Sequence, residues 1–483
     1  MSRRNFYLLL VVLAISFACY HKADSANRSH YEPMFDIFKS VMTEIKDHYL
    51  FSEDIDERKL FDGAMEGMVE QLDDYSSYDG HEETQRFHET LDQQFGGIGI
   101  EIDWNRETKT LSVMSPMVGT PAYEAGILAG DRILKIDDKP VEEFVDSQDA
   151  VKLIKGKPGD LVKLTIVHRG ETKPIELSIE RAIIKVDTVL GDRRLPDGHW
   201  DYTLAEDPRI GYIRITQFAE RTVDELSEAL RQCRAKKVRG LILDVRNNPG
   251  GLLDAAYKTC DFFVREGVIV TIRERGGKER ERREATGQAE YTEWPMAVLV
   301  NHFSASASEI VAACLQDRNR AVVVGERSWG KGTVQSPIEL EGGKSLLRLT
   351  IASYWRPSDK NIHRKRDAKE ADVWGVSPSP GYEVKLDDKQ LIEMLKRRRA
   401  RDVDQQIEKN EASRAGTTST APSSVPSEPS GTTPAATATG SARPASEPAG
   451  SAQQRKKESS PDSPAIDPQL ARAVEYLEEK FSK

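Results

Sequence analysis

Apolar residues recur along the first part of the chain in two different rhythms. Over residues 31–90 they return every three or four positions, as at Phe35 and Phe38, and this spacing predicts a helical N-terminal arm. Over residues 94–185 apolar and polar residues alternate in runs such as LVKLTIVHR and PIELSIER, separated by Gly, Pro and Asp turns. That alternation predicts a small β-rich domain, with one short helix at 147–154.

A third rhythm begins near Arg209. Short apolar runs such as RIGYIRI, GLILDVR, VIVTIRE and MAVLVN alternate with helical patterns such as VDELSEALRQCRA. Apolar strands separated by helices are typical of an α/β layer with a buried sheet. We therefore expect an α/β core over residues 186–395, with functional groups where its strands end and its helices begin.

The chain ends in two segments of contrasting composition. Beyond about Arg401 it consists largely of Ala, Ser, Thr, Pro and Gly and cannot bury enough apolar surface to fold, so we expect a disordered linker over residues 396–465. Residues 466–483 regain helical spacing through Leu470 and Leu477. Because a lone amphipathic helix needs a docking surface, we expect it to pack against the N-terminal arm, within one chain or across a two-fold dimer.

The first twenty residues, MSRRNFYLLLVVLAISFACY, place arginines before a mostly apolar run. This run has the form of a secretory signal and is short for a stable membrane span. The arginines partly match a twin-arginine signal, and Cys19 partly matches a lipoprotein cleavage site. We expect residues 1–26 to direct export, either as a cleaved signal peptide or as a retained anchor that attaches the protein to the membrane.

The composition of the chain argues against several classes of protein. With 483 residues and 38% hydrophobic composition, the chain is long enough for several domains, and its formal net charge of -10 argues against a general nucleic-acid binder. Basic runs at 274–285 and 396–401 are expected to be solvated faces or flexible segments. Cys233, Cys260 and Cys314 lie in predicted helices without paired spacing, so they predict small buried apolar residues rather than a disulfide framework or a metal site.

The serine-rich segment NHFSASASEIVAACLQ precedes an apolar helical run. Among its serines, Ser306 alone has a glutamate three residues later, Glu309, which is the spacing of a helix capping box. Ser306 is therefore expected at the start of the helix, where the amide of Ala307 points to a place that an oxyanion could occupy. Considered alone, the segment is better explained by a serine that only caps the helix.

A second candidate lies in WGKGTVQ, where Lys331 stands between glycines just after an apolar strand. A lysine fixed by close backbone packing in an apolar setting can lose its proton near neutral pH and act as a general base. The alternatives are an exposed turn lysine and a phosphate-binding loop. The phosphate loop requires Ser or Thr after the lysine, and Gly332 stands there instead, which excludes nucleotide binding.

A third candidate is LILDVRNNPGGLL. An apolar strand ends in Asn247 and Asn248, and Gly250 and Gly251 follow before a helix. Flexible backbone amides are thereby placed at the carboxyl edge of the sheet. A plain strand-to-helix turn explains the same residues equally well.

The β-rich domain resembles a PDZ domain, through FGGIGI and TPAYEAGILAGDRILKIDDKPV. FGGIGI alone would indicate only a glycine-rich start of a strand. With the rest of the domain, it resembles a carboxylate-binding loop, in which the amides near Gly97, Ile98 and Gly99 hold the terminal carboxylate of a peptide that adds as a strand. The last side chain of that peptide would enter a pocket lined by Ile98 and Ile100, with Val151 and Ile154 as further candidates for its lining.

Taken together, SASASE, GKGTVQ and DVRNNPGG behind a PDZ-like domain resemble the carboxyl-terminal processing, or tail-specific, proteases. The resemblance implies an α/β protease core with a crotonase/ClpP-like sheet and helices, an upstream β-rich PDZ domain, and helical N- and C-terminal segments. It also implies that Ser306 is the nucleophile, that Lys331 is the base and that Gln335 orients the lysine. Gly250 or Gly251 would join the Ala307 amide as an oxyanion donor.

Two departures and one rival residue qualify the resemblance. WGVSPSPGYEV replaces the family's Pro-Asp after Gly-Val, and a long low-complexity insertion precedes the final helix. His302 is the rival base, four residues before Ser306. It lies on the strand side of the turn, no matching acidic partner is evident in the sequence, and the resemblance assigns it no role.

The expected function is an exported serine endopeptidase of the periplasm or cell envelope. It would recognise protein or peptide substrates by their free C-terminus through the PDZ domain, cleave them with a Ser-Lys dyad, form a homodimer, and need no metal or organic cofactor. One alternative is a catalytically silent PDZ-type peptide-binding scaffold of the cell envelope. A second, an acyl-CoA-type enzyme on a related sheet, is disfavoured by the PDZ-like domain.

Overall fold

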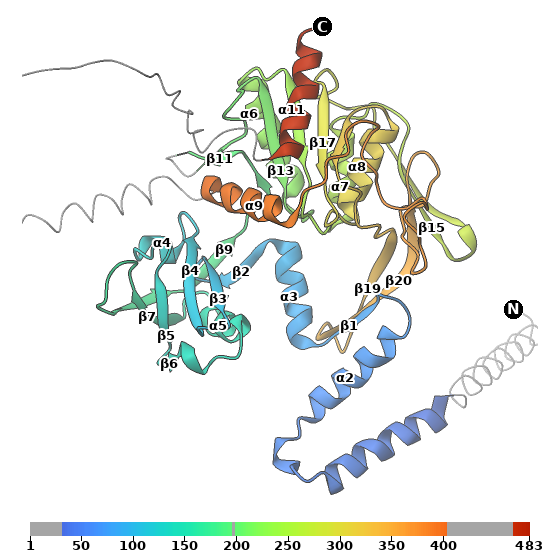
Figure 1. Ribbon diagram of the computed structural model, residues 1–483. Helices are drawn as coiled ribbons and strands as arrows, with labels where there is room; N and C mark the ends of the chain where they lie inside the picture. The colour runs from blue at the N-terminus through green and yellow to red at the C-terminus, as the bar shows by residue number, and fades with distance from the viewer. Residues whose placement is uncertain (1–30, 196–198, 403–466) are drawn as a thin grey trace, which may run out of the picture. The chain divides into compact units, whose positions relative to one another are not determined.

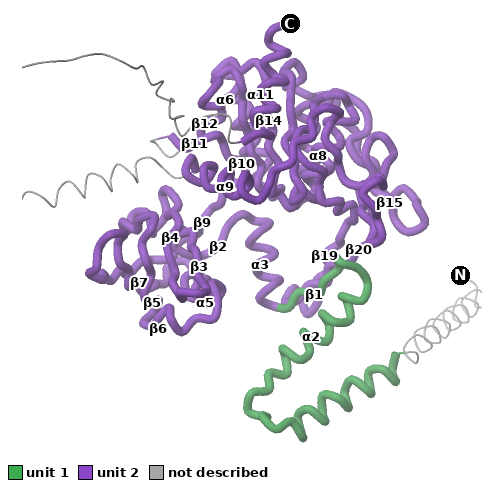
Figure 2. The backbone as a smooth tube through the Cα atoms, viewed as in Figure 1, with its two compact units in different colours: residues 1–80 green, residues 81–483 purple. Residues whose placement is uncertain are grey.

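The computed structural model describes residues 31–195, 199–402 and 467–483, which divide after Gly80 into two compact units (Figure 2). In the first unit, large apolar side chains are exposed, among them Phe35 at 68% and Leu50 at 83%. Residues 1–26, which we expect to direct export, lie outside the described residues. The elements of the first unit are a helix over 31–48, the 3-10 helix η1 (Ser52–Asp54), α2 (Glu57–Glu70) and β1 (Ser77–Asp79).

The second unit begins with α3 (His81–Asp92) and continues into the β-rich domain (Figure 1). An antiparallel sheet of order β3-β4-β5-β7-β8 surrounds a core that includes Ile98, Leu111 and Ile133. The predicted helix at 147–154 is confirmed as α5 (Ser147–Ile154). The main strands are β2 (Gln94–Gly97), β3 (Ile100–Asn105), β4 (Thr110–Pro116), β5 (Arg132–Ile136), β7 (Leu161–Val167), β8 (Ile175–Glu180) and β9 (Ala182–Lys185), joined by α4 (Pro121–Glu124), β6 (Lys139–Pro140) and η2 (Val141–Glu143).

A parallel sheet forms the α/β core, as the apolar runs predict. Its order is β10-β13-β14-β17-β18, in which the short edge strand β10 alone runs antiparallel to its neighbour. The strands are β10 (Val189–Leu190), β13 (Ile210–Ile215), β14 (Gly240–Asp244), β17 (Met296–Val300) and β18 (Val322–Gly325), and the helices between them are α6 (Thr222–Ala235), α7 (Leu253–Asp261) and α8 (Ala307–Asp317).

Both faces of this sheet are buried, which explains why its strands are apolar throughout. Leu241 and Leu243 of β14 belong to the core formed with α6, α7 and α8. Ile242, between them, packs on the opposite face with Ala473 and Leu477 of α11 (Pro468–Phe481). The predicted partner of the C-terminal helix was therefore wrong: α11 covers the core sheet, because that face would otherwise expose its apolar residues to water.

A second sheet was not separated from the first by the sequence pattern. The segment VIVTIRE forms β15 (Val268–Glu274), which pairs with β16 (Glu279–Glu284) and β20 (Ser345–Trp355) rather than with the parallel strands. Strand β20 also pairs antiparallel with β19 (Thr333–Leu340). Two small features complete the core. They are a pair of short antiparallel strands, β11 (Arg193–Arg194) and β12 (Trp200–Asp201), and the 3-10 helix η3 (Arg275–Gly277).

The basic run at 396–401 differs from its prediction. It lies in α9 (Asp388–Asp402), so the helix extends six residues beyond Lys396, where the linker was expected to begin. Arg398 and Arg401 both donate to the fully buried carboxylate of Asp192, at 3.1 and 2.9 Å, so they dock the helix rather than remain solvated. The remainder of the predicted linker, residues 403–465, lies outside the described residues.

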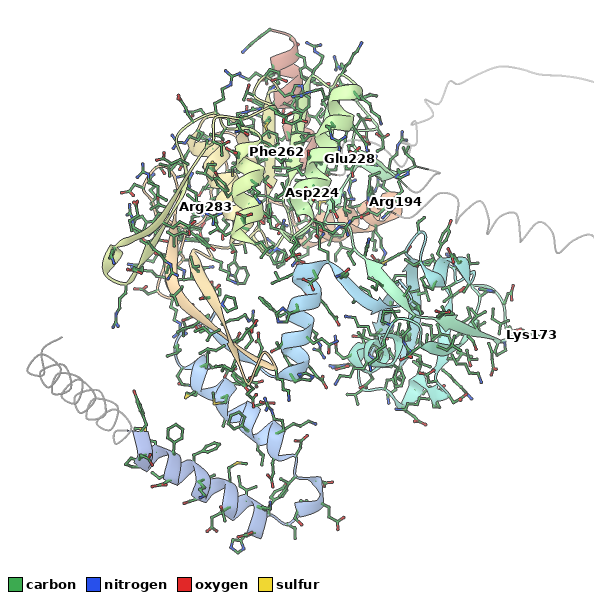
Figure 3. The ribbon with its side chains drawn as sticks, turned by 180° about the vertical axis from the view of Figure 1, so that it is seen from behind. Lys173, Arg194, Asp224, Glu228, Phe262 and Arg283 are labelled. Carbon is green, nitrogen blue, oxygen red and sulfur yellow. The ribbon has the colours of Figure 1, made fainter. Side chains whose placement is uncertain are left out.

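The other basic run forms an outer strand. Residues of β16 are mostly exposed, as predicted for a solvated face. Arg283, labelled in Figure 3, donates to Asp254 of α7 at 2.9 Å. Cys233, Cys260 and Cys314 are buried and free, as predicted.

Candidate active site

Ser306 occupies the turn that joins β17 to α8. It is the N-cap residue of α8 and has φ 56° and ψ -114°, a backbone conformation that costs a non-glycine residue about 1–3 kcal/mol. Ser304 and Ser308 are fully buried, and their hydroxyls donate to the carbonyls of Val245 and Asn248 at 2.8 and 3.0 Å. Of the three serines, Ser306 is the one that is partly exposed, which a reacting hydroxyl requires.

Lys331 lies in the loop between β18 and β19, where the backbone is held from two sides. Gly330 and Gly332 accept hydrogen bonds from the amides of Arg364 and Tyr354, at 2.8 and 2.7 Å. A Cβ atom on Gly332 would lie 2.1 Å from the backbone nitrogen of His363, so only glycine permits this approach. The close backbone packing that the sequence suggested around the lysine is present.

The surroundings of Lys331 change its acidity. Burial lowers the pKa of the ammonium group, the positive charge of Arg348 on β20 lowers it further, and the negative charge of Glu309 opposes both. The lysine therefore releases its proton more readily than a lysine in water. Arg348 has no signal in the sequence, because its effect depends on the pairing of β19 with β20.

Glu309 links the two segments, and sequence reasoning identified it only as a capping partner. Its carboxylate accepts the amide of Ser306 at 2.8 Å, as the capping-box spacing predicts, and it also accepts the amide of Lys331 at 2.8 Å. Both amides donate to the same oxygen, Oε2, so the two nitrogens lie no farther apart than twice that distance. The structure thereby brings Ser306 and Lys331 together, 25 positions apart in the sequence.

The glycine turn packs directly against Ser306. A Cβ atom on Gly250 would lie 2.7 Å from the Ser306 Cβ and 3.0 Å from the Ala307 nitrogen. The amide of Gly250, however, donates to Asn248 Oδ1 at 2.8 Å. Within the described part of the chain, the amides of Gly251 and Ala307 have no acceptor.

Gln335 lies on β19, four residues after Lys331. Its side-chain nitrogen donates to the hydroxyls of Thr333 and Thr350, at 2.9 and 3.1 Å. Among the described residues, the hydrogen bonds of this side chain go to these two threonines rather than to the lysine. They fix the orientation of the amide group beside the Lys331 loop.

His302 does have an acidic partner, contrary to the expectation from the sequence. Its Nδ1 lies 2.9 Å from Glu326 Oε2, and its side chain is 51% exposed. The partner was missed because Glu326 is 24 positions away and reaches the histidine only after β18 pairs with β17. The histidine faces solvent while Glu326 is 17% exposed, and among the described residues none of the hydrogen bonds of the pair joins it to Ser306.

The predicted peptide-binding residues lie at the start of the PDZ-like sheet. Gly97 pairs with Ala182 in the β2–β9 ladder, and Gly99 has φ 78° and lies close to Thr120. Ile98 is fully buried in the domain core, so its side chain does not line an open pocket as we predicted. Ile100 is partly exposed and begins β3, whose other edge carries no strand among the described residues.

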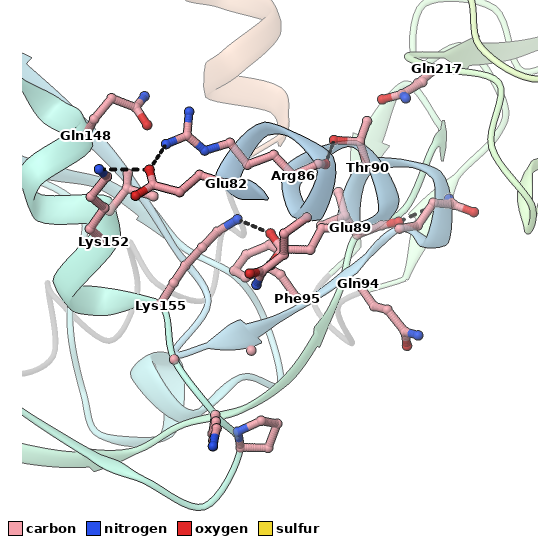
Figure 4. A pocket seen from close by; sticks show the side chains of 18 of the residues that line it. Glu82, Arg86, Glu89, Thr90, Gln94, Phe95, Gln148, Lys152, Lys155 and Gln217 are labelled. Carbon is pink, nitrogen blue, oxygen red and sulfur yellow. Dashed lines mark hydrogen bonds and ion pairs between the residues drawn. The ribbon is translucent and has the colours of Figure 1, made fainter. Parts of the chain in front are cut away.

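A cavity of about 880 Å³ lies beside this region, between α3, β2 and α5 (Figure 4). Its lining includes Phe95 and Val151, and ion pairs cross it from Lys155 to Glu89 at 2.6 Å and from Lys152 to Glu82 at 2.9 Å. The four predicted peptide-binding residues are not part of this lining.

Two absences concern the described residues alone. No group of three or more His, Cys, Asp or Glu side chains there is arranged to hold a metal ion. None of the helices in residues 31–195, 199–402 and 467–483 combines the length and apolar character needed to cross a bilayer.

Comparison with known families gives three matches along the chain. Residues 209–378 match Peptidase family S41, residues 96–179 match the PDZ domain, and residues 16–84 match the N-terminal domain of the activating protease CtpB. The first match contains Ser306, Lys331 and the glycine turn, and the second contains the glycine-rich loop.

Individual relatives agree with these matches. A carboxy-terminal-processing protease of Bartonella bacilliformis is 38% identical over 364 residues, covering 74% of this chain and 78% of that protein. The carboxy-terminal processing protease CtpA of Bacillus subtilis is 37% identical over 332 residues, covering 68% and 67%. Among solved structures, a photosystem II D1 C-terminal processing protease is 28% identical, covering 71% of this chain and 86% of that one with a TM-score of 0.40.

Proposed function

Because the chain belongs to the S41 family of carboxy-terminal processing proteases, we propose that it is an exported endopeptidase in which Ser306 is the nucleophile and Lys331 is the general base. The observation that carries this assignment is the single carboxylate oxygen of Glu309 that accepts the amides of both residues. This shared acceptor holds the backbones of a partly exposed serine and of a lysine of lowered pKa close together, which supports the pairing that nucleophilic catalysis needs.

The reaction follows from these two groups. Ser306 Oγ attacks the scissile carbonyl carbon while neutral Lys331 Nζ accepts the hydroxyl proton. The lysine then gives that proton to the departing amine as the C–N bond breaks, which leaves an acyl ester on Ser306. A water molecule, deprotonated in turn by Lys331, attacks the ester carbonyl carbon. The C–O bond to Ser306 then breaks, Ser306 Oγ takes the proton back from Lys331, and the shortened substrate leaves with a new terminal carboxyl group.

The developing oxyanion is stabilised by backbone amides. We assign the donors as Ala307 and Gly251, because both amides are without an acceptor in the described structure whereas that of Gly250 is bonded to Asn248. Gly250 contributes space instead, since a side chain there would collide with Ser306. The resemblance assigns Gln335 the orientation of Lys331. Its Nε2 is held by Thr333 and Thr350, so its Oε1 is the atom that would accept from the lysine side chain.

Substrate recognition is assigned to the PDZ domain. The free edge of β3 can accept a peptide as an added strand beside α5, with the peptide's terminal carboxylate at the loop that contains Gly97 and Gly99. Ile100 and Val151, both partly exposed, would then face the last side chain of the peptide. Substrates of this kind are proteins or peptides with a free C-terminus.

Location and assembly are proposals from the N-terminal region. The apolar run after the arginines supports export to the periplasm or cell envelope. The exposed apolar side chains of residues 31–72 support a homodimer formed through this arm, because isolated large apolar patches usually mark an interface.

The decisive experiment is to trap the acyl-enzyme. A peptide substrate is mixed with the full chain, the reaction is stopped with acid, and the protein is digested for mass spectrometry. We expect an acyl adduct on the peptide that contains Ser306, and none in Ser306→Ala. Turnover by Ser306→Ala, or an adduct on another residue, would refute the assignment.

A further inference from the structure

Glu309 is a fully buried glutamate whose carboxylate accepts four hydrogen bonds. Oε2 accepts the amides of Ser306 and Lys331, each at 2.8 Å. Oε1 accepts the amide of Gly330 at 2.7 Å and the hydroxyl of Ser328 at 2.5 Å. One side chain of α8 thereby connects the turn before its own helix to the loop between β18 and β19.

Helix capping accounts for only one of these bonds. A capping box needs the Glu309 carboxylate at the Ser306 amide, but not at residues 328–331. An ordinary capping glutamate is also exposed, whereas burial raises the pKa of Glu309 to about 7 against the lowering effect of its hydrogen bonds. A costly buried carboxylate with donors from two catalytic segments suggests a role beyond the helix.

Both catalytic backbones depend on this carboxylate. Ser306 adopts its positive φ with its amide turned to Oε2, and Lys331 turns its amide to the same atom between two glycines. If the carboxylate were absent, each amide would lose its acceptor. The turn at Ser306 and the loop at Lys331 would then lose the link that residue 309 provides between them. A misplacement of about 1 Å between reacting groups can reduce a rate by about 100-fold.

We propose that Glu309 is the positioning residue of the Ser-Lys pair: its ionised carboxylate holds the backbones of Ser306 and Lys331 in register for proton transfer. This proposal rests on the proposed function of the same site. Glu309 is fully buried and both of its oxygens accept from protein donors, so it acts through Ser306 and Lys331 rather than on the substrate.

The charge of the carboxylate also acts on Lys331. Among the described residues, the charged groups acting on the lysine are Glu309 from α8, which raises its pKa, and Arg348 from β20, which lowers it. Neutral lysine becomes available as the pH rises through that pKa. Removal of the Glu309 charge therefore moves the rise of activity to lower pH.

The test compares kcat and KM of the full chain across pH for the wild type and Glu309→Gln. The glutamine side chain carries an NH2 group, which is a donor and faces groups that also donate. The backbones of Ser306 and Lys331 should therefore shift, and kcat should fall about 100-fold. KM should stay within about twofold, because substrate binding is not altered. The acid limb of the remaining activity should move to lower pH.

Ser328→Ala is a milder second variant with the opposite sign. The Ser328 hydroxyl lowers the pKa of Glu309, so its removal leaves the carboxyl protonated to higher pH. Because only the ionised carboxylate positions the Ser-Lys pair, the acid limb should move upward. Gln316→Ala is the matched control at the far end of α8, where the lost bonds are to Ser377, Ser379 and Arg356. It should lower the melting temperature without moving kcat or the pH profile.

The outcomes distinguish the positioning role of Glu309 from the proposed protease activity of Ser306 and Lys331. The positioning role is overturned if folded Glu309→Gln keeps full kcat, or if it loses kcat while its acid limb does not move. In either case Ser306→Ala should still be inactive, because the proposed function does not depend on the role of Glu309. Shifts in the same direction for Glu309→Gln and Ser328→Ala overturn it as well. Activity in Ser306→Ala would instead refute the proposed function itself.

Discussion

Arg246 donates two hydrogen bonds to the carboxylate of Asp467, at 3.0 and 2.9 Å, although 221 positions separate the two residues. Asp467 caps α11, and Arg246 directly precedes the asparagine and glycine turn that packs against Ser306. The guanidinium also bonds to Asp244, whose pKa it holds below the usual value although burial alone would raise it. The last helix of the chain is therefore anchored at the end of β14 from which the candidate oxyanion turn begins.

The first prediction concerns this anchor. Asp467→Asn removes the charge that faces a guanidinium only 5% exposed, and it weakens the two charge-assisted bonds. We expect the free energy of unfolding to fall by about 1–3 kcal/mol. Urea denaturation of the full chain measures this change.

Glu479→Gln provides the control on the same helix. Glu479 is exposed, so its substitution should change stability by less than about 0.5 kcal/mol. Equal stability of Asp467→Asn and the wild type would show that the ion pair contributes nothing to the docking of α11.

The second prediction concerns the glycine turn. In Gly250→Ala the new Cβ would lie 2.8 Å from the Ala305 carbonyl oxygen and 2.7 Å from the Ser306 Cβ, at a residue with φ 104°. Because backbone must move to relieve these contacts, kcat should fall about 100-fold. Gly277 also has a positive φ, but a Cβ atom added there would meet no atom within 4 Å. Gly277→Ala should therefore retain kcat, and it controls for backbone strain. Comparable kcat in both variants would contradict the close packing of Gly250 on the nucleophile.

The third prediction concerns the base. The lysine pKa is lowered, so the neutral form accumulates, and activity rises, at pH values below the reference of about 10.4. Lys331→Arg should lose about 1,000-fold or more in single-turnover rate at every pH, because arginine stays protonated and offers donors where an acceptor is needed.

His302→Ala is the matched control for that prediction. His302 is half-exposed, and the loss of its pair with Glu326 should leave the single-turnover rate within about threefold of the wild type. If His302→Ala abolished turnover while Lys331→Arg only weakened it, histidine would be the base.

The fourth prediction concerns substrate capture by the PDZ domain. A peptide added to β3 is held by its terminal carboxylate, so amidation of that carboxylate should lower kcat/KM by about tenfold or more. A second peptide with an internal substitution far from both the terminus and the cleavage site serves as the control. Equal processing of amidated and free-acid peptides would exclude recognition of the C-terminus.

Local sequence patterns determined several features of this protein without any tertiary information. The bounds of α5 follow from its spacing, and the apolar strands of the core follow from their length and composition. Ser306 is placed at the start of α8 because the Ser306 and Glu309 spacing acts within one helical turn. Such features depend on residues that are neighbours in the chain.

Only the tertiary structure decided which distant residues meet. The Lys331 amide reaches Glu309, Glu326 reaches His302, and Arg246 reaches Asp467 only after the parallel strands and α11 have packed. These contacts depend on strand order and on which face of a sheet a helix covers. No spacing within a single element encodes either of them.

The oxyanion turn shows the same division within a few residues. The sequence determined that Gly250 and Gly251 lie at the carboxyl end of a buried strand, and it left either amide as the donor. The fold separated them, because Asn248 Oδ1 accepts the Gly250 amide and leaves that of Gly251 without an acceptor among the described residues. A hydrogen bond is decided by the position of its acceptor, and that position exists only once the chain has folded.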